Sequence, residues 1–189
     1  MAVTTWNIDP AHTDVLFSAK HMMVTTVRGT FHDVTGTITV DEDDLTQSSG
    51  TFTVDVASLS TGVEPRDQHL RSADFFDAEG FPTATFVSTA VRAKGGNDFA
   101  VTGDLTIRGT TRPVTFDVEL LGFYTGLNGA RRTGLRGTTK LAREDFGLNW
   151  NVALESGGWL VGKEVRLELD LAFEQAAPVE TDTEVRAAA

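Results

Sequence analysis

Apolar and polar residues alternate with a period of two along most of this chain, most clearly between residues 98 and 120. Residues 98–108 alternate, the short segment Gly109-Thr110-Thr111 follows, and residues 114–120 alternate again. Strict alternation on both sides of a short turn predicts an antiparallel hairpin with one apolar face. The same pattern recurs elsewhere, and it predicts further strands at residues 5–9, 15–21, 27–31, 36–40, 52–56, 83–91, 134–143 and 165–173.

One short helix is expected among these strands. It begins near Glu64-Pro65, because proline suits the first turn of a helix, and it runs to about Asp74. The apolar stripe of this helix is narrow, so we expect the helix to act as a plug or lid rather than as a layer that covers the sheet. Gly134 and Gly137 inside a strand indicate a bulge or a corner. The pattern at residues 146–159 does not indicate which secondary structure they form.

A sheet with one apolar face and almost no helix to cover it must fold on itself. We therefore predict an all-β fold, a single antiparallel β-barrel of about eight strands with one short helix. A two-sheet sandwich gives the same alternation and is the structural alternative. The barrel domain is expected over residues 1–175, followed by a disordered acidic tail at 176–189 with Glu180, Asp182 and Glu184. Eight strands enclose either packed side chains or one small ligand.

Composition excludes several function classes. The net charge of −11 argues against binding to nucleic acid or to anionic lipid headgroups. Arg131, Arg132 and Arg136 form a local basic group, which we interpret as a solvated turn and strand edge. The sequence has no apolar run long enough for a transmembrane helix and no signal peptide, so no stable membrane insertion is expected. Together with the absence of cysteine, this predicts a cytoplasmic protein.

Evidence for catalysis is weak. The sequence has no nucleophile elbow, no phosphate-binding glycine loop and no cysteine nucleophile. Carboxylates such as Asp117, Glu119, Glu168 and Asp170 occupy outward strand positions, which is typical of a soluble surface. We therefore expect a protein that is not an enzyme, and no metal site.

The histidines keep one alternative open, a metal- or haem-dependent enzyme that would use His12, His21 and His69. Their spacing does not match the tight pairs typical of zinc sites. His21 shares the parity of Val15 and Phe17, so it points inward if they do. It is then either a core histidine or a donor to the polar end of a ligand.

The aromatic residues favour an apolar interior, with twelve Phe and three Trp against one Tyr. These side chains either fill a solid barrel, which would make the protein an interaction module without a ligand, or line a cavity. The residues alone leave both readings open.

Several segments, in this order along the chain, resemble the YceI-like family of polyisoprenoid-binding proteins. They are residues 6–13 (WNIDPAHT), 17–21 (FSAKH), 29–31 (GTF), 69–76 (HLRSADFF), 81–82 (FP), 103–114 (GDLTIRGTTRPV) and 143–147 (REDFG). One departure is Thr13, where the family commonly has serine. Many family members carry a signal peptide, which this sequence lacks.

The resemblance implies a lipocalin-like barrel whose apolar tunnel binds and carries or stores a long-chain isoprenoid, either quinone-like or polyprenyl. No cofactor other than this lipid is expected, and a homodimer through Leu16 and Leu121 is compatible with the pattern. Head-group selection is expected at the tunnel ends, by His21, His69, Arg71 or the segment from Trp150 to Trp159. The residues expected to line the tunnel are Phe17, Val54, Phe86, Leu105, Phe116, Val118, Leu169 and Leu171.

Overall fold

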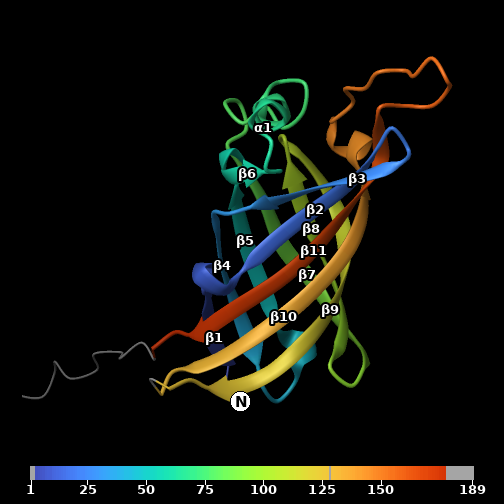
Figure 1. Cartoon of the computed structure of the whole chain (residues 1–189). Helices are drawn as coiled ribbons and strands as arrows, with labels where there is room; N and C mark the ends of the chain where they lie inside the picture. Colours follow the sequence, from blue (N-terminus) through green and yellow to red (C-terminus); the bar gives the residue numbers. More distant parts are fainter. Residues whose placement is uncertain (1–2, 128, 178–189) are drawn as a thin grey trace, which may run out of the picture.

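A computed structural model describes residues 3–127 and 129–177 of the chain (Figure 1). Of the predicted disordered tail at 176–189, residues 178–189 lie outside the described residues. The strands are β1 (Val3–Ile8), β2 (Asp14–His21), β3 (Thr25–Phe31), β4 (Val34–Asp41), β5 (Ser49–Asp55), β6 (Leu59–Ser60), β7 (Thr83–Gly95), β8 (Asp98–Ile107), β9 (Thr110–Thr125), β10 (Arg131–Ala142) and β11 (Val161–Gln175).

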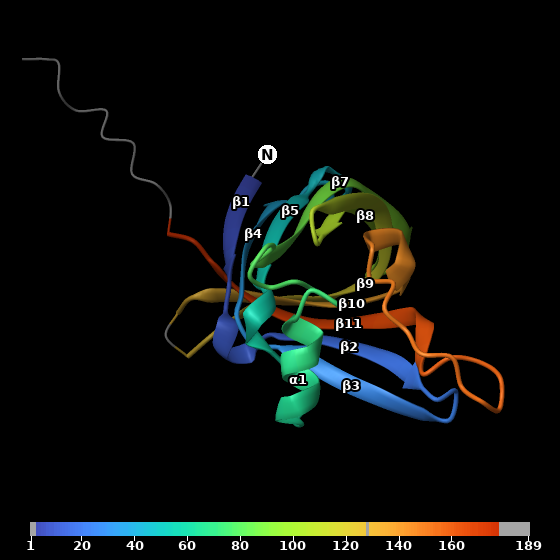
Figure 2. The ribbon, with the colours of Figure 1, turned by 90° about the horizontal axis from the view of Figure 1, so that it is seen from above.

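These strands form one antiparallel sheet in the order β1-β4-β5-β7-β8-β9-β10-β11-β2-β3-β6. An additional pairing of β1 with β11 closes eight of them, β1, β4, β5 and β7 to β11, into a barrel. The ring of strands is visible from above in Figure 2. The predicted barrel is therefore confirmed, and the sandwich alternative is wrong.

The extra strands continue the wall rather than add a second layer. β1 pairs with β11 at Ile8↔Phe173, and β2 pairs with the same strand from Asp14↔Asp170 onward. β4 pairs with β1, while β3 pairs with β2. Thus β1 and β2 together form one interrupted strand beside β11, and β3 and β4 form the next. The interruptions are short. The 3₁₀ turn η1 (Pro10–His12) lies between β1 and β2, and only two residues separate β3 from β4.

The predicted hairpin at residues 98–120 is confirmed, since β8 pairs with β9 from Asp98↔Glu119 to Ile107↔Thr110. The bulge expected near Gly134 is also present. The register between β10 and β9 shifts between Thr133 and Leu135. A bulge increases the local bend of a strand, which helps a long strand such as β10 to wrap around the barrel.

The predicted helix is present as α1 (Glu64–Arg71), three residues shorter than expected at its C-terminal end. The backbone N–H of Ser72 donates to the carbonyls of Gln68 and His69, which ends the helix. Further 3₁₀ turns are η2 (Leu45–Gln47), η3 (Val56–Ser58) and η4 (Arg143–Phe146). No helix among the described residues is long and apolar enough to cross a membrane.

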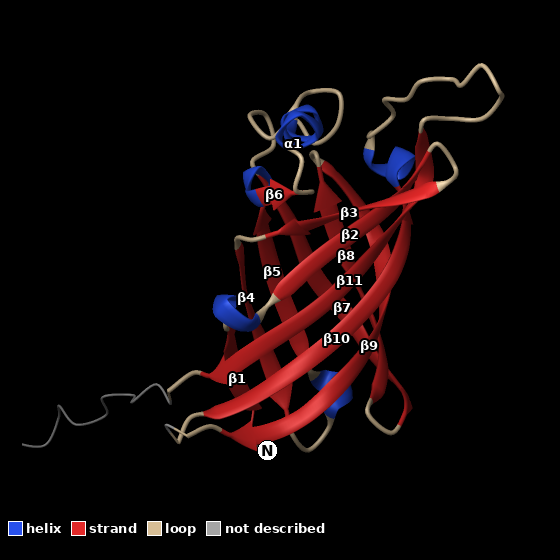
Figure 3. Ribbon diagram, in the orientation of Figure 1, coloured by secondary structure: helices blue, strands red, loops and turns tan. Residues whose placement is uncertain are grey.

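The barrel has two different ends (Figures 1 and 3). At the end that we call the base lie the start of β1, η2 and the β9–β10 connection. At the opposite end, which we call the cap, lie α1, η4 and the connection from η4 to β11. One cluster of buried apolar residues surrounds Trp6 and Phe173, and a second surrounds Phe116 and Phe146.

Candidate functional site

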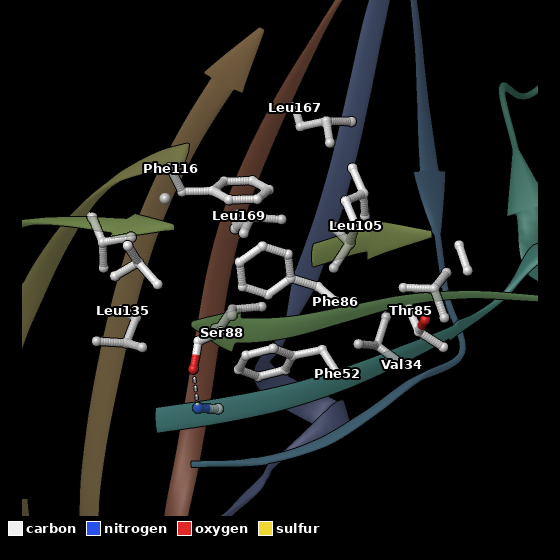
Figure 4. A pocket seen from close by; sticks show the side chains of 18 of the residues that line it. Val34, Phe52, Thr85, Phe86, Ser88, Leu105, Phe116, Leu135, Leu167 and Leu169 are labelled. Atoms are coloured by element: carbon white, nitrogen blue, oxygen red, sulfur yellow. Dashed lines mark hydrogen bonds between the residues drawn. The ribbon is translucent and has the colours of Figure 1, made fainter. Parts of the chain in front are cut away.

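The barrel encloses a large apolar cavity. Its volume is about 290 Å³, counted as the space open to the centre of a water molecule. One water needs only about 10–15 Å³ by this measure, so the cavity can hold a ligand rather than a few waters. Figure 4 shows Phe52, Phe86 and Phe116, which come from three strands, pointing into the same space.

Several inward side chains are only partly buried although they lie inside the barrel. Phe17, Phe86, Val118 and Leu169 all line the cavity, and each retains some exposed surface. In a barrel filled by its own side chains, residues at these positions would be covered by packing at interior density. Their remaining exposure is surface that faces the cavity.

The phenylalanine rings pack over glycines of the neighbouring strand. Phe17 lies opposite Gly29, and a Cβ built on Gly29 would come within 2.3 Å of the tip of its ring. The same close approach occurs between Phe86 and Gly103. Without side chains at these glycines the rings can rest against the wall, and a methyl group at Gly29 would push the ring of Phe17 away from it.

The base is closed by tightly packed aromatic residues. The side chain of Trp6 on β1 is fully buried, and its ring centroid lies 5.4 Å from that of Phe123 on β9. The guanidinium of Arg131 lies 5.3 Å from the centroid of Trp6 and 5.6 Å from that of Phe123. Such a cation over two aromatic faces adds to the stability of the closure.

An ion pair holds Arg131 in this position. Its Nη1 and Nη2 donate to Oε1 and Oε2 of Glu42 at 2.8 Å and 3.0 Å. The hydrogen bond from Arg131 lowers the pKa of Glu42, and Glu42 in turn raises the pKa of Arg131. Arg132 contacts Asp9 and Glu174. The side chains of Arg131, Arg132 and Arg136 are 38–60% exposed on β10, which agrees with our interpretation of a solvated strand edge. The ion pairs themselves were not predicted, because the facing acids lie far away in the sequence.

The cap is held together by contacts between two loops. The ring centroid of His69 on α1 lies 4.6 Å from that of Trp150, and Phe75 lies 5.3 Å from Trp150. Arg108 donates from Nη1 to the carbonyls of Phe75 and Gly147 at 3.0 Å and 3.2 Å. The segment after α1 and the segment after η4 thus meet above the end of the barrel.

Helix α1 is anchored to the barrel by two charged side chains. Arg71 donates from Nε and Nη2 to the carbonyls of Ala57 and Leu59 at 2.9 Å and 2.6 Å. Asp67 is buried; burial raises its pKa, but hydrogen bonds from Thr61 lower the pKa overall. Arg71, which we expected near the head group, therefore fixes the helix and does not line the cavity.

All eight residues that we expected to line the tunnel do line the cavity, and their contact with a ligand stays a prediction. These residues are Phe17, Val54, Phe86, Leu105, Phe116, Val118, Leu169 and Leu171.

The four aromatic and histidine residues expected at the tunnel ends do not line the cavity. His21 is the last residue of β2, at the turn into β3, so it keeps the parity of Phe17 and Ala19 but does not line the cavity. His69 and Trp150 belong to the cap. Trp159 lies in the connection to β11, bridged to Ala153, and is 48% exposed.

Sequence reasoning missed the charged residue of the cavity wall. Arg143 follows β10 directly and lines the cavity beside Leu141. It has the same odd parity as Leu135 and Leu141, which also line the cavity, and this parity was the signal that could have identified it.

The histidines do not form a metal site. His12 contacts Asp9 through Nδ1 at 2.9 Å, and His69 contacts Asp74 through Nε2 at 2.9 Å. Over residues 3–127 and 129–177, no three His, Cys, Asp or Glu side chains gather in a way that could hold a metal ion. The arrangement that the enzyme alternative requires, with His12, His21 and His69 at one point, is not what the structure shows.

Comparisons with known proteins place this barrel among relatives. Residues 6–173 match the YceI-like domain family. A UPF0312 protein of Staphylococcus epidermidis is 41% identical over 172 residues, 90% of this chain and 98% of that protein. The crystal structure of Burkholderia cenocepacia BcnA is 29% identical with a TM-score of 0.75, covering 87% of this chain and 98% of that chain.

A polyisoprenoid binding domain from Saccharophagus degradans, described as implicated in plant cell wall breakdown, has the same fold. It is 16% identical with a TM-score of 0.65, and the match covers 92% of this chain and 99% of that chain.

Proposed function

Since this chain belongs to the YceI-like domain family, we propose that its barrel binds a long-chain isoprenoid lipid and carries or stores it. The observation that carries the proposal is the cavity itself, whose lining is almost entirely apolar side chains. The ligand class is suggested by the polyisoprenoid binding domain that shares the fold. The protein acts by binding, without a catalytic step.

The energetics favour a long ligand over a compact one. Full burial of one isoprene unit, with about five carbons, stabilises the complex by roughly 4 kcal/mol from methylene burial. Drug-sized ligands realise nearer ~0.3 kcal/mol per atom, which is about 1.5 kcal/mol per unit. Several units are therefore needed for tight binding. Hydrophobic contacts also discriminate poorly between chains that differ by a methylene, so the tail supplies affinity more than specificity.

A substitution that fills the cavity tests whether the space is used. We expect Val118→Trp to fold with little loss of stability, because Val118 faces the cavity, and to bind a fluorescent prenyl probe at least about tenfold more weakly. A barrel packed with its own side chains would instead lose about 1–3 kcal/mol of stability from overpacking. The matched control is Val87→Trp on β7, where the side chain is exposed and probe binding should be unchanged.

A further inference from the structure

Arg143 is the one charged side chain among the described residues that line the cavity. It lies at the start of η4, at the cap end of the barrel, and is only 5% exposed. A buried cation in an apolar wall is costly unless a partner compensates it. The question is therefore which group satisfies this guanidinium.

The protein itself satisfies only part of it. Nε donates to the carbonyl of Gly162 at 2.9 Å, and Nη1 donates to the carbonyl of Leu148. The third nitrogen, Nη2, is buried and has no hydrogen-bond partner among the described residues. Two of the three nitrogens thus fix the side chain against the backbone of the cap, and the third donates no hydrogen bond.

Two of the other polar side chains in the cavity wall are hydrogen-bonded within the barrel. Ser88 Oγ accepts from the N–H of Gly50 at 2.8 Å (Figure 4). Thr133 donates from Oγ1 to the carbonyl of Gly122 at 2.8 Å. Arg143, by contrast, keeps an unused buried donor at the cap end of the cavity wall.

The charge of Arg143 is only partly compensated. Burial lowers its pKa, against an opposing effect of the neighbouring Glu144. The carboxylate of Glu144 is in an ion pair with Lys163 at 3.2 Å, and both side chains are exposed. The two groups that accept from Arg143 are neutral carbonyls. An anionic oxygen would supply both the missing hydrogen bond and the missing negative charge, and charge-assisted bonds of this kind are the stronger class.

We propose that Arg143 binds the anionic head group, a phosphate or a carboxylate, of the lipid in the cavity. The head group then lies beneath the cap, and the tail extends toward Trp6 and Phe123 at the base. This assignment rests on the function proposed above and adds to it the ligand's charge and its direction in the barrel.

The test compares two ligands that differ only in the head group, geranylgeranyl phosphate and geranylgeraniol. We expect the protein to bind the phosphate about tenfold or more tightly, since one charge-assisted hydrogen bond is gained. Arg143→Gln keeps donors but removes the charge, so it should abolish this preference while binding the alcohol as before. Arg108→Gln is the control, because Arg108 also donates to cap carbonyls but does not line the cavity.

Equal binding of both ligands by the unaltered protein, or a preference that survives in Arg143→Gln, would overturn the role of Arg143 alone. Binding of neither ligand would overturn the proposed function as well. If Arg143→Gln does not fold, photocrosslinking of the unaltered protein decides. A diazirine beside the phosphate should label the region of Leu141 to Leu148, and one at the chain's far end should label residues near Phe123. The reversed pattern would refute the assignment.

Discussion

The two ends of the barrel are closed by different kinds of contact. At the base, residues from β1, β9 and β10 meet directly, with a fully buried tryptophan under an arginine that is held by a carboxylate. At the cap, two loops meet through aromatic edges and through arginine side chains that donate to backbone carbonyls. A closure between strands can open only if the sheet itself is disrupted, whereas loops can separate locally at low cost. We therefore expect lipid to enter and leave at the cap.

Removal of the central side chain of the base should have the largest effect on stability. Trp6→Ala deletes a fully buried ring, and we expect the free energy of unfolding to fall by about 3–5 kcal/mol. Urea denaturation measures this change. Trp159→Ala is the matched control, since that side chain is 48% exposed and should cost well under about 1 kcal/mol. Similar losses in the two variants would mean that the base is not the firmly packed end.

A methyl group at Gly29 should disturb the wall between the two ends. In Gly29→Ala the new Cβ meets the ring of Phe17, so the ring must move into the cavity. We expect a loss of about 1–3 kcal/mol and reduced lipid capacity. The double variant Gly29→Ala/Phe17→Leu should recover much of the stability and of the lipid capacity, because the smaller side chain leaves room for the methyl group. Simple additivity of the two changes would show that ring and glycine do not interact as described.

Loosening the cap should change kinetics more than stability. Trp150→Ala removes the ring that packs against both His69 and Phe75, at a cost of about 0.5–1.5 kcal/mol for the aromatic contacts. We expect transfer of a fluorescent prenyl probe to acceptor vesicles to become several-fold faster. Tyr124→Ala at the base, where the side chain is 64% exposed, is the control and should leave the rate unchanged. An unchanged rate in Trp150→Ala would place the route of the lipid elsewhere.

The smallest effect is expected from the ion pair at the base, and it depends on pH. Because Arg131 lowers the pKa of Glu42, the pair contributes stability above the unfolded pKa of glutamate, about 4.3. This contribution is lost as the pH falls through the lower folded pKa. Urea midpoints of the unaltered protein and Glu42→Gln should therefore differ most above about pH 5 and converge in acid. A difference that persists at low pH would contradict the role of this charge.

The wall of the barrel could be predicted from the sequence because its signal is local. Alternation places Leu105, Phe116 and Leu169 on one face, and a sheet with one apolar face and little helix has to close. The hairpin of β8 and β9 and the start of α1 follow from turn glycines and from Pro65 in the same way. Family resemblance added the expectation of a lipid, which composition alone does not give.

The ends could not be predicted because they depend on residues far apart in the chain. The partner of Arg131 is Glu42, and Trp150 meets His69, pairs that no periodicity reveals. His21 has the parity of an inward residue, but it is the last residue of β2 and does not line the cavity, and the pattern alone does not show where along a strand the cavity ends. Arg143 ends the strand predicted at residues 134–143 with inward parity, and it was overlooked because a charged side chain is not expected on the apolar face of a strand.

The central claim is that the cavity holds an isoprenoid lipid, and the most direct test is extraction of the purified protein. Protein prepared without detergent is extracted with organic solvent, and the extract is examined by mass spectrometry before and after incubation with isoprenoids. We predict a prenyl-chain lipid in stoichiometric amount, which is lost in Val118→Trp and retained in Val87→Trp. An extract without lipid, both as isolated and after incubation, would contradict the account and leave a barrel whose cavity serves no isoprenoid.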